Sequence, residues 1–366
     1  MRLWIGTIFA AFLAAMPLLA VDKPADEKGN DRETQFKNIQ TDYQKAVPQA
    51  QKALRAAKST KDQKAVIEKL NMEFAPRVVK LVEMDPKDDV SFKVLMFAVQ
   101  ALPNADRKVF DLLADNWAKE KRIAKDENIR LLCQLFLSQR QPGMKIVLQK
   151  VLDENKEKNA QGFACFALGK QAIEQQSEGD KKAIEEAEKY LERVAKEFAD
   201  IKIGPTTLGA EVKGPLFEIR HLSVGKTPPN VESQNLDGKK VELKDYKGKV
   251  VVLDIWATWC GPCKSMIPHE REMVKKHKDK PFALISVSGD DEKETLKKFL
   301  ETTEMPWVHW WDGREGNIVK GWNVTGFPTI YVLDTKGVIR YKFVGVVTDA
   351  LDDAVEKLLA EAKYQK

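Results

Sequence analysis

Two cysteines three residues apart carry the clearest chemical signal in the sequence. Cys260 and Cys263 enclose Gly261 and Pro262, and an apolar run at 250–257 precedes them. The run predicts a strand buried on both faces, and a helical pattern starts at Gly261. A thiol between a strand and a helix N-terminus lies near the positive end of the helix dipole, which favours the nucleophilic thiolate.

This arrangement predicts reversible two-electron exchange between thiols and disulfides. We expect Cys260 to attack a disulfide and Cys263, one helical turn later, to resolve the mixed disulfide that forms. Gly261 leaves the approach to the thiol open, and Pro262 suits the first turn of a helix. Because the two sulfurs carry both electrons, no cofactor is expected.

Two other uses of a Cys-x-x-Cys motif compete with redox exchange. A zinc half-site needs further ligands, but the sequence has no second close pair of cysteines, and its four histidines show no ligand spacing. A purely structural disulfide would close so short a loop that it adds little chain entropy. We therefore favour the redox interpretation and expect no metal.

The segment around the motif resembles the active-site segment of thioredoxins. The run Val-Leu-Asp-Ile-Trp-Ala-Thr-Trp-Cys-Gly-Pro-Cys-Lys at 252–264 carries this resemblance, which covers residues 222–366. An apolar N-terminal segment, a hairpin before the first core strand and a longer connection after the second helix resemble the secreted TlpA-like, redoxin-type branch. The resemblance implies protein substrates with cysteine pairs and a thiol electron donor, soluble or in a membrane.

The resemblance also assigns roles to residues outside the motif. Asp254 matches the thioredoxin aspartate that takes the proton from the second cysteine, so we expect it to be the general base toward Cys263. Burial within an apolar strand would raise its pKa, whereas a strand-end aspartate facing water is the alternative. Pro328 matches the cis-proline of the loop that pairs with substrate, and Phe327 is expected to contact substrate. An ordinary trans-proline is the alternative.

Five residues form the expected substrate-binding set. Trp259 borders the thiol and is expected to add an apolar docking surface. The full set is Trp259, Gly261, Pro262, Phe327 and Pro328.

The sequence departs from the TlpA-like pattern on the active-site helix. Met266 stands where many such proteins carry an acidic residue, and the Gly-Pro pair between the cysteines is that of thioredoxin, which favours a reductant. Pro268 matches the kink of the thioredoxin helix. His269 and Glu270 follow it and are interpreted as part of a solvated face.

The C-terminal half alternates strands and helices, which predicts a mixed sheet with helices on both faces. Asp237-Gly238 marks the turn of an opening hairpin. Strands are expected at 250–257, 282–288, 329–333 and 338–344, the last at a sheet edge, and helices at 261–277, 292–302 and near the C-terminus.

Residues 33–200 have a helical period and predict an all-helical array of about eight helices. The starts expected at Asp88, Asp126 and Asn159 lie 38 and 33 residues apart, near the period of two-helix repeats such as tetratricopeptide units. An irregular array is the alternative. Cys133 and Cys165 lie on apolar helical faces, where two buried thiols are favoured over a bridge.

The remaining segments complete the domain organisation. Residues 1–20 read as a secretory signal peptide, and an uncleaved membrane anchor through 3–21 is the alternative. A flexible tether is expected at 21–32 and a linker at 201–221. Both readings of the N-terminus place the chain in a periplasmic or other extracytoplasmic compartment.

Composition limits the class of protein. The chain has 366 residues, 43% of them hydrophobic and 31% charged, which excludes a wholly disordered, collagen-like or multi-span membrane protein. A net charge of +5 without a block of like charge gives no case for nucleic acid as a partner.

The sequence therefore predicts an extracytoplasmic thiol–disulfide oxidoreductase, favoured as a reductant, for example of the cytochrome c maturation type. One alternative is a helical interaction scaffold with a redox-switchable thioredoxin-like module. A redoxin-type peroxidase is less favoured, because Ala257 stands where that chemistry needs a hydroxyl.

Overall fold

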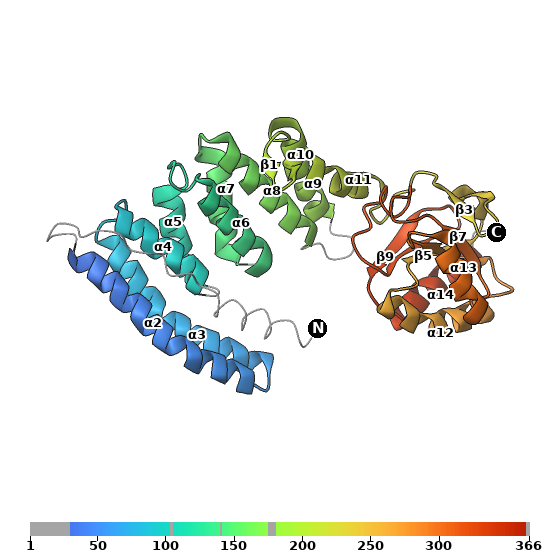
Figure 1. Ribbon diagram of the computed structural model, residues 1–366, viewed down its shortest axis with the longest axis horizontal. Coiled ribbons are helices and arrows are strands. Elements are labelled where there is room, and N and C mark those ends of the chain that lie inside the picture. Colours follow the sequence, from blue (N-terminus) through green and yellow to red (C-terminus); the bar gives the residue numbers. More distant parts are fainter. Residues whose placement is uncertain (1–29, 103–104, 140, 175–180, 364–366) are drawn as a thin grey trace. The chain divides into compact units, whose positions relative to one another are not determined.

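The computed structural model describes residues 30–102, 105–139, 141–174 and 181–363. These residues form two compact units, one drawn from 1–174 and 196–208 and the other from 175–195 and 209–366 (Figure 1). The expected signal peptide and residues 21–29 of the tether lie outside the described ranges. Within those ranges, no helix combines the length and apolarity that a membrane crossing requires.

Eight helices span residues 30–197 of the described chain, in agreement with the expected array. They are α2 (Asn30–Ala56), α3 (Thr60–Glu83), α4 (Asp89–Ala101), α5 (Arg107–Trp117), α6 (Asp126–Gln139), α7 (Pro142–Glu154), α8 (Lys158–Glu174) and α9 (Lys181–Glu197). Helices adjacent in the chain pack together, as α2 does with α3 and α7 with α8, while α5 also packs on α7 and α6 on α8.

Polar caps start several of these helices. Asp88 caps α4 by accepting a hydrogen bond from the Ser91 amide, as the sequence predicted. Asp106 caps α5 by accepting a hydrogen bond from the Lys108 amide. Asn159 is inside α8 rather than before it.

Aromatic packing and buried thiols lie in the interior of the N-terminal unit. The Tyr43 ring meets those of Phe74 and Phe97 edge to face, at centroid distances of 5.3 and 5.5 Å. Cys133 and Cys165 are both buried, and the structure joins neither of them in a disulfide. Two buried thiols were the favoured expectation.

A seven-stranded mixed sheet forms the centre of the C-terminal unit. Its order is β4-β3-β7-β6-β5-β8-β9, with β5 parallel to β6 and antiparallel to β8. The bounds are β3 (Glu232–Asn235), β4 (Lys240–Glu242), β5 (Val250–Trp256), β6 (Phe282–Ser288), β7 (Val308–Trp311), β8 (Thr329–Leu333) and β9 (Ile339–Val344). The expected hairpin, core strands and edge strand are all present, and β7 was not predicted.

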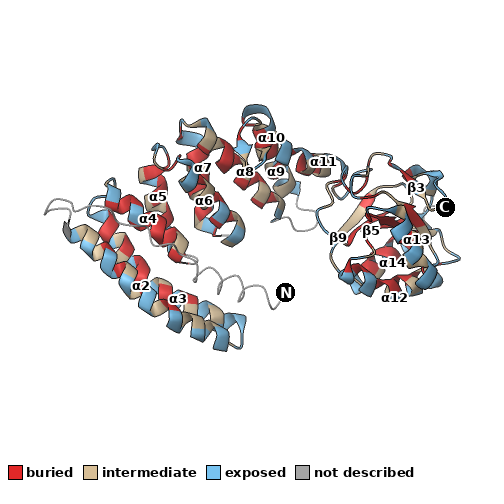
Figure 2. Cartoon of the chain, in the orientation of Figure 1, coloured by how far each residue is buried: buried red, intermediate tan, exposed pale blue. Residues whose placement is uncertain are grey.

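The two faces of the sheet are covered differently, because successive side chains of a strand point to opposite faces. Val250 and Val252 of β5 pack in a cluster with α12 (Gly261–Lys276) and α14 (Asp349–Lys363). Trp256, farther along the same strand face, packs near α13 (Lys293–Thr302). Leu253 and Ile255 face the other cluster, which Phe217 joins. Buried residues accordingly fill the centre of this unit (Figure 2).

The expected linker at 201–221 has regular structure along much of its length. It contains the small strands β1 (Lys202–Ile203) and β2 (Thr206–Thr207), followed by α10 (Leu208–Glu211) and α11 (Lys213–His221). Its glycines and prolines predicted a break, but Pro215 lies in the first turn of α11, where a helix tolerates proline. Leu216 and Ile219 of α11 are buried, so tertiary packing stabilises this helix.

Candidate active site

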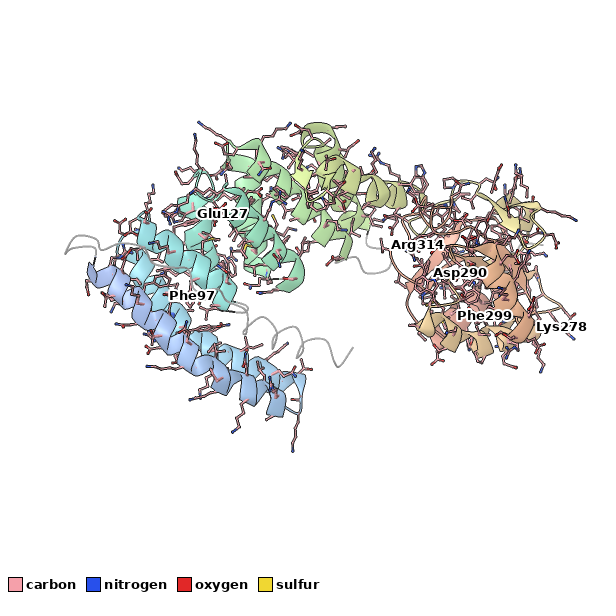
Figure 3. All side chains as sticks on the ribbon, viewed as in Figure 1. Phe97, Glu127, Lys278, Asp290, Phe299 and Arg314 are labelled. Atoms are coloured by element: carbon pink, nitrogen blue, oxygen red, sulfur yellow. A yellow bond between two sulfur atoms is a disulfide. The ribbon has the colours of Figure 1, made fainter. Side chains whose placement is uncertain are left out.

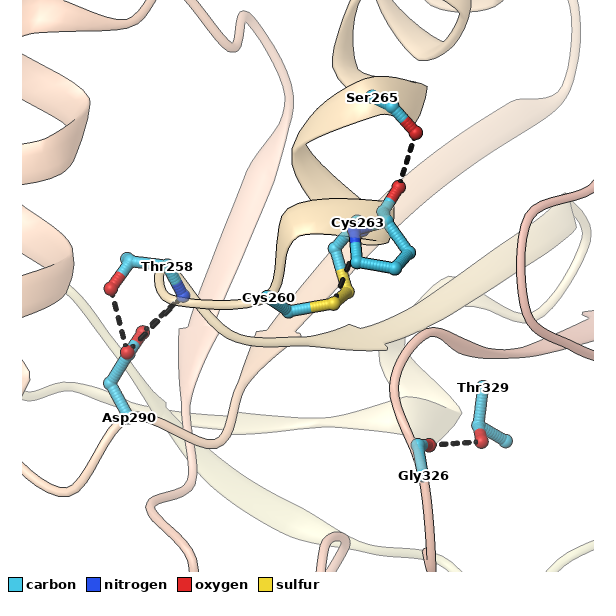
Figure 4. Close-up of a disulfide and its surroundings, with 8 residues drawn as sticks. Thr258, Cys260, Cys263, Ser265, Asp290, Gly326 and Thr329 are labelled. Carbon is cyan, nitrogen blue, oxygen red and sulfur yellow. Dashed lines mark hydrogen bonds between the residues drawn. A yellow bond between two sulfur atoms is a disulfide. The ribbon is translucent and has the colours of Figure 1, made fainter. Parts of the chain in front are cut away.

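The predicted cysteine pair lies where β5 ends and α12 begins. Cys260 and Cys263 form a disulfide with an Sγ–Sγ distance of 2.04 Å (Figure 4). Cys260 is the N-cap of α12, and its sulfur accepts a hydrogen bond from the Cys263 amide at 3.1 Å. A thiolate at the position of Cys260 would receive this amide hydrogen bond and lie at the positive end of the helix dipole.

A buried aspartate holds the turn that leads into Cys260. The carboxylate of Asp290 accepts hydrogen bonds from the amide of Thr258 at 3.1 Å and from its hydroxyl at 2.8 Å (Figure 4). The Ser288 hydroxyl donates a third at 2.7 Å. Asp290 lies inside the C-terminal unit, where Figure 3 labels it. Sequence reasoning missed Asp290, and its position just after β6, the parallel neighbour of β5, is the signal that points to it.

The loop before β8 has the cis-proline that the resemblance implied. The peptide bond between Phe327 and Pro328 is cis, and Pro328 is buried. The Gly345 amide donates to the Pro328 carbonyl at 2.9 Å, and the Thr329 hydroxyl donates to the Gly326 carbonyl at 2.8 Å. Phe327 lies close to the backbone of Gly289, where a Cβ atom would come within 2.7 Å of its ring. These contacts fix the loop against the strand ends.

Apolar side chains are exposed beside the cysteines. Trp259 is 57% exposed, and its ring lies 5.6 Å from that of Phe327. Gly261 and Pro262 are also exposed, and a Cβ atom on Gly261 would meet nothing within 4 Å. The structure thus brings Trp259 and Phe327 together and leaves the surface at Gly261 open, while Cys260 itself is 5% exposed.

Asp254 lies in the interior, three residues before the end of the apolar run. It is only 4% exposed, in the middle of β5, so the alternative of a strand-end aspartate facing water is wrong. Its Oδ1 atom is buried without a hydrogen-bond partner. Burial raises the pKa of this carboxyl to about 7, because a charged carboxylate is poorly solvated there.

Glu270 corrects the interpretation of the active-site helix. We expected His269 and Glu270 on a solvated face, but Glu270 is 2% exposed. It shares the buried side of α12 with Met266 and Met273, at helical spacings of four and three residues. His269 is half-buried and lies 3.3 Å from the Asp352 carboxylate of α14. Burial and the charge of Asp254 raise the pKa of Glu270 well above its usual range.

Comparisons with known proteins agree with this geometry. Residues 224–342 match the AhpC/TSA family. The thiol-disulfide oxidoreductase ResA of Bacillus thuringiensis subsp. konkukian is 33% identical over 138 residues, which are 37% of this chain and 79% of that protein. The chain belongs to the thiol–disulfide oxidoreductases of the thioredoxin superfamily.

Further proteins are similar over a comparable length. The thioredoxin-like protein YneN of Bacillus subtilis is 35% identical over 130 residues, which are 35% of this chain and 75% of that protein. A solved structure titled as a putative thiol:disulfide interchange protein DsbE from Chlorobium tepidum is 30% identical, with a TM-score of 0.35. The match covers 38% of this chain and 97% of the chain in that structure.

Proposed function

We propose that this oxidoreductase acts outside the cytoplasm and reduces disulfides in protein clients through Cys260 and Cys263. The observation that carries the proposal is the cysteine pair at the N-terminus of α12, beside the exposed ring of Trp259 and the cis-Pro328 loop. A nucleophile at a helix N-terminus next to an apolar surface suits attack on a cystine in an extended client segment.

The exchange proceeds in two balanced steps. The Cys260 thiolate attacks one sulfur of the client disulfide, a mixed disulfide forms, and the other client sulfur leaves as a thiolate. Cys263 then loses its proton to the Asp254 carboxylate and attacks Cys260, which releases the second client thiolate. The client gains two electrons and takes up two protons, and the enzyme ends with the disulfide seen here.

The substrate-binding roles follow from the surface around the disulfide. Trp259 and Phe327 supply apolar contact, while Gly261 and Pro262 leave room for the client beside Cys260. The backbone next to Pro328 is proposed to pair with the client segment. Val344 and Val346, 69% and 57% exposed, extend the same apolar surface, because the Gly345 between them is hydrogen-bonded to Pro328.

Location and direction of electron flow rest on sequence features. The apolar segment at 3–21 supports export, and the Gly-Pro pair between the cysteines supports a reductant. Oxidised cysteine pairs of apocytochromes are one client class that fits a reductant outside the cytoplasm, with a soluble or membrane-bound thiol protein as electron donor.

Three cysteine variants test the chemistry. Cys260→Ser should abolish reduction of a protein disulfide such as that of insulin. Cys263→Ser should accumulate a mixed disulfide with the client, visible by mass spectrometry under non-reducing conditions. Cys133→Ser changes a buried thiol of the N-terminal unit and should keep full activity. A Cys260→Ser protein that still reduces insulin would refute the assignment.

Location is tested separately. The N-terminus of the exported protein, read by mass spectrometry, should begin after Ala20 if the segment is a cleaved signal peptide. A retained segment in the membrane fraction would support the anchor, and a chain confined to the cytoplasm would refute the extracytoplasmic proposal.

A further inference from the structure

The buried side of α12 faces the row of β5 side chains to which Asp254 belongs. Val250 and Val252 share one cluster with Met266 and Met273 of the helix. Asp254 is the next residue on the same face of β5, because side chains alternate along a strand. Glu270 lies between the two methionines on the same face of α12. The two carboxyl groups therefore lie in the same layer between sheet and helix, close enough for the charge of Asp254 to act on Glu270.

Both carboxyl groups are buried and incompletely satisfied. Asp254 is 4% and Glu270 2% exposed. Oδ1 of Asp254 and Oε1 of Glu270 have no hydrogen-bond partner among the described residues. Two negative charges in one apolar layer would repel each other without solvent screening, so at least one carboxyl has to keep its proton. Glu270 is the less exposed of the two, and burial and the charge of Asp254 raise its pKa, so we take Glu270 as the group that keeps the proton.

Among the residues that the structure describes, no cation lowers the pKa of either carboxyl. Ser286 of β6 is in register with Asp254, and its hydroxyl accepts a hydrogen bond from the Trp307 indole at 2.7 Å. His309 of β7 is in register with Ser286, and burial lowers its pKa, which favours the neutral ring.

On the other side of β5, and on the two helices, the neighbours are an apolar residue, a thiol and an ion pair. Ile330 of β8, in register with Asp254, is apolar. On α12, Cys263 is the thiol that loses its proton in the proposed function. From α14, Asp352 pairs with His269 at 3.3 Å. None of these neighbours is a lysine or arginine, whose positive charge could keep both carboxylates ionised.

We propose that Glu270 is a positioning residue for the proton transfer: its protonated carboxyl donates a hydrogen bond to the Asp254 carboxylate and so stabilises the base that receives the Cys263 proton. This rests on the proposed role of Asp254. The pair holds one proton before Cys263 ionises and two afterwards, and the added proton then leaves to the client thiolate or to solvent. Glu270 thereby supplies an acidic group one helical turn after Met266, the position at which many TlpA-like proteins carry theirs, on the same face of α12.

Infrared spectroscopy tests the protonation of Glu270 without reference to activity. At pH 8 the oxidised full chain should show the C=O band of a protonated glutamate, identified by its isotope shift after labelling with carboxyl-¹³C glutamate. Glu270→Gln should remove that band. Glu272→Gln, a change on the exposed side of the same helix, should leave it. A band unchanged in Glu270→Gln, or absent from the wild type, would overturn the proposal.

Kinetics test the link to Asp254. Reaction with a chromogenic aromatic disulfide releases one coloured thiolate when Cys260 attacks and a second when Cys263 resolves, so the second release reports the resolving step. Its rate should rise with pH around the pKa of Asp254, about 7. Glu270→Met should move this profile to higher pH and slow resolution at pH 7 about tenfold, the scale of one hydrogen bond to an ionised group.

The conservative variant separates positioning from packing. Glu270→Gln keeps an N–H donor toward Asp254 and should retain a profile close to the wild type, as should Glu272→Gln. Equal slowing in the glutamine and methionine variants, or no change in either, would overturn the proposal. If Glu270→Met does not fold, Asp254→Asn serves instead. Because this variant removes the charge of Asp254, it should lower the pH at which the labelled glutamate band disappears. An unchanged pH would overturn the proposal.

Failure of the proposed function would look different. Asp254→Asn resolving at the wild-type rate, with the glutamate band intact, would remove Asp254 as the base while leaving the protonated Glu270 in place.

Discussion

Replacing Asp254 by asparagine should make the folded protein more stable at neutral and alkaline pH. Asparagine has nearly the same shape as aspartate but carries no charge. The folded state buries Asp254 and raises its pKa from the ordinary value of 3.8 to about 7. Below pH 4 the carboxyl is neutral in both the folded and the unfolded chain. As the pH rises toward 7, the unfolded chain loses the proton more readily, and the wild type loses stability.

The size of the effect follows from that pKa difference. Each tenfold change in proton concentration between the two pKa values costs about 1.4 kcal/mol, so the cost levels off above pH 7 at about 4 kcal/mol. Asp254→Asn should therefore match the wild type at pH 4 and exceed its free energy of unfolding by about 4 kcal/mol at pH 8. The same variant should resolve mixed disulfides more slowly, because it lacks the base.

Chemical denaturation at pH 4, 6 and 8 measures this difference on the oxidised chain. Tryptophan fluorescence reports mainly the C-terminal unit, which contains six of the eight tryptophans. Asp279→Asn, an exposed substitution in the same unit, is the control and should change little. An Asp254→Asn protein whose stability relative to the wild type is the same at pH 8 as at pH 4 would refute the argument that burial raises this pKa.

Three further results are expected. Asp290→Asn should destabilise the C-terminal unit by about 1.5–3 kcal/mol, because charge-assisted hydrogen bonds to Thr258 weaken. The exposed Asp291→Asn is the control. Equal denaturation midpoints for the two variants would contradict a stabilising role of Asp290. Trp322→Ala should cost about 3–5 kcal/mol, since this residue is 1% exposed and packs on Tyr331, whereas Trp259→Ala should leave stability nearly unchanged and weaken client binding, measured by KM for insulin. Cys133 and Cys165 should resist alkylation until denaturant is added, because both are buried and burial raises the pKa of Cys133; rapid labelling of the native protein, followed by mass spectrometry, would contradict this.

Strands of the C-terminal unit were predictable where burial is continuous. The largely apolar runs that became β6 and β8 have the expected bounds, because a strand covered on both faces leaves a nearly continuous hydrophobic signal. Strand β7 was missed, since it has four residues and contains His309 and two tryptophans. Its place between β6 and β3 depends on pairing with distant segments, which a local pattern does not report.

The cysteine pair was predictable from spacing, and two of its neighbours were not. Asp290 is separated by 32 residues from the Thr258 that it binds, so only the fold brings them together. Glu270 was misassigned because its charge was weighed above its position. The positions Met266, Glu270 and Met273 lie on one helical face, and this spacing predicts burial whatever residue type occurs there.

Helix α11 changes where the catalytic half of the chain should be divided from the rest. Glu218 accepts hydrogen bonds from Lys342 of β9 and, at 3.2 Å, from Asn323. Arg220 of the same helix binds Glu188 of α9 at 2.7 Å. A fragment cut at Leu222, or at the start of the family match at 224, would leave Lys342 and Asn323 without these partners and uncover the apolar surface under Phe217. A fragment that begins at Lys181 keeps these partners, so the catalytic piece should extend upstream of the recognisable thioredoxin-like sequence.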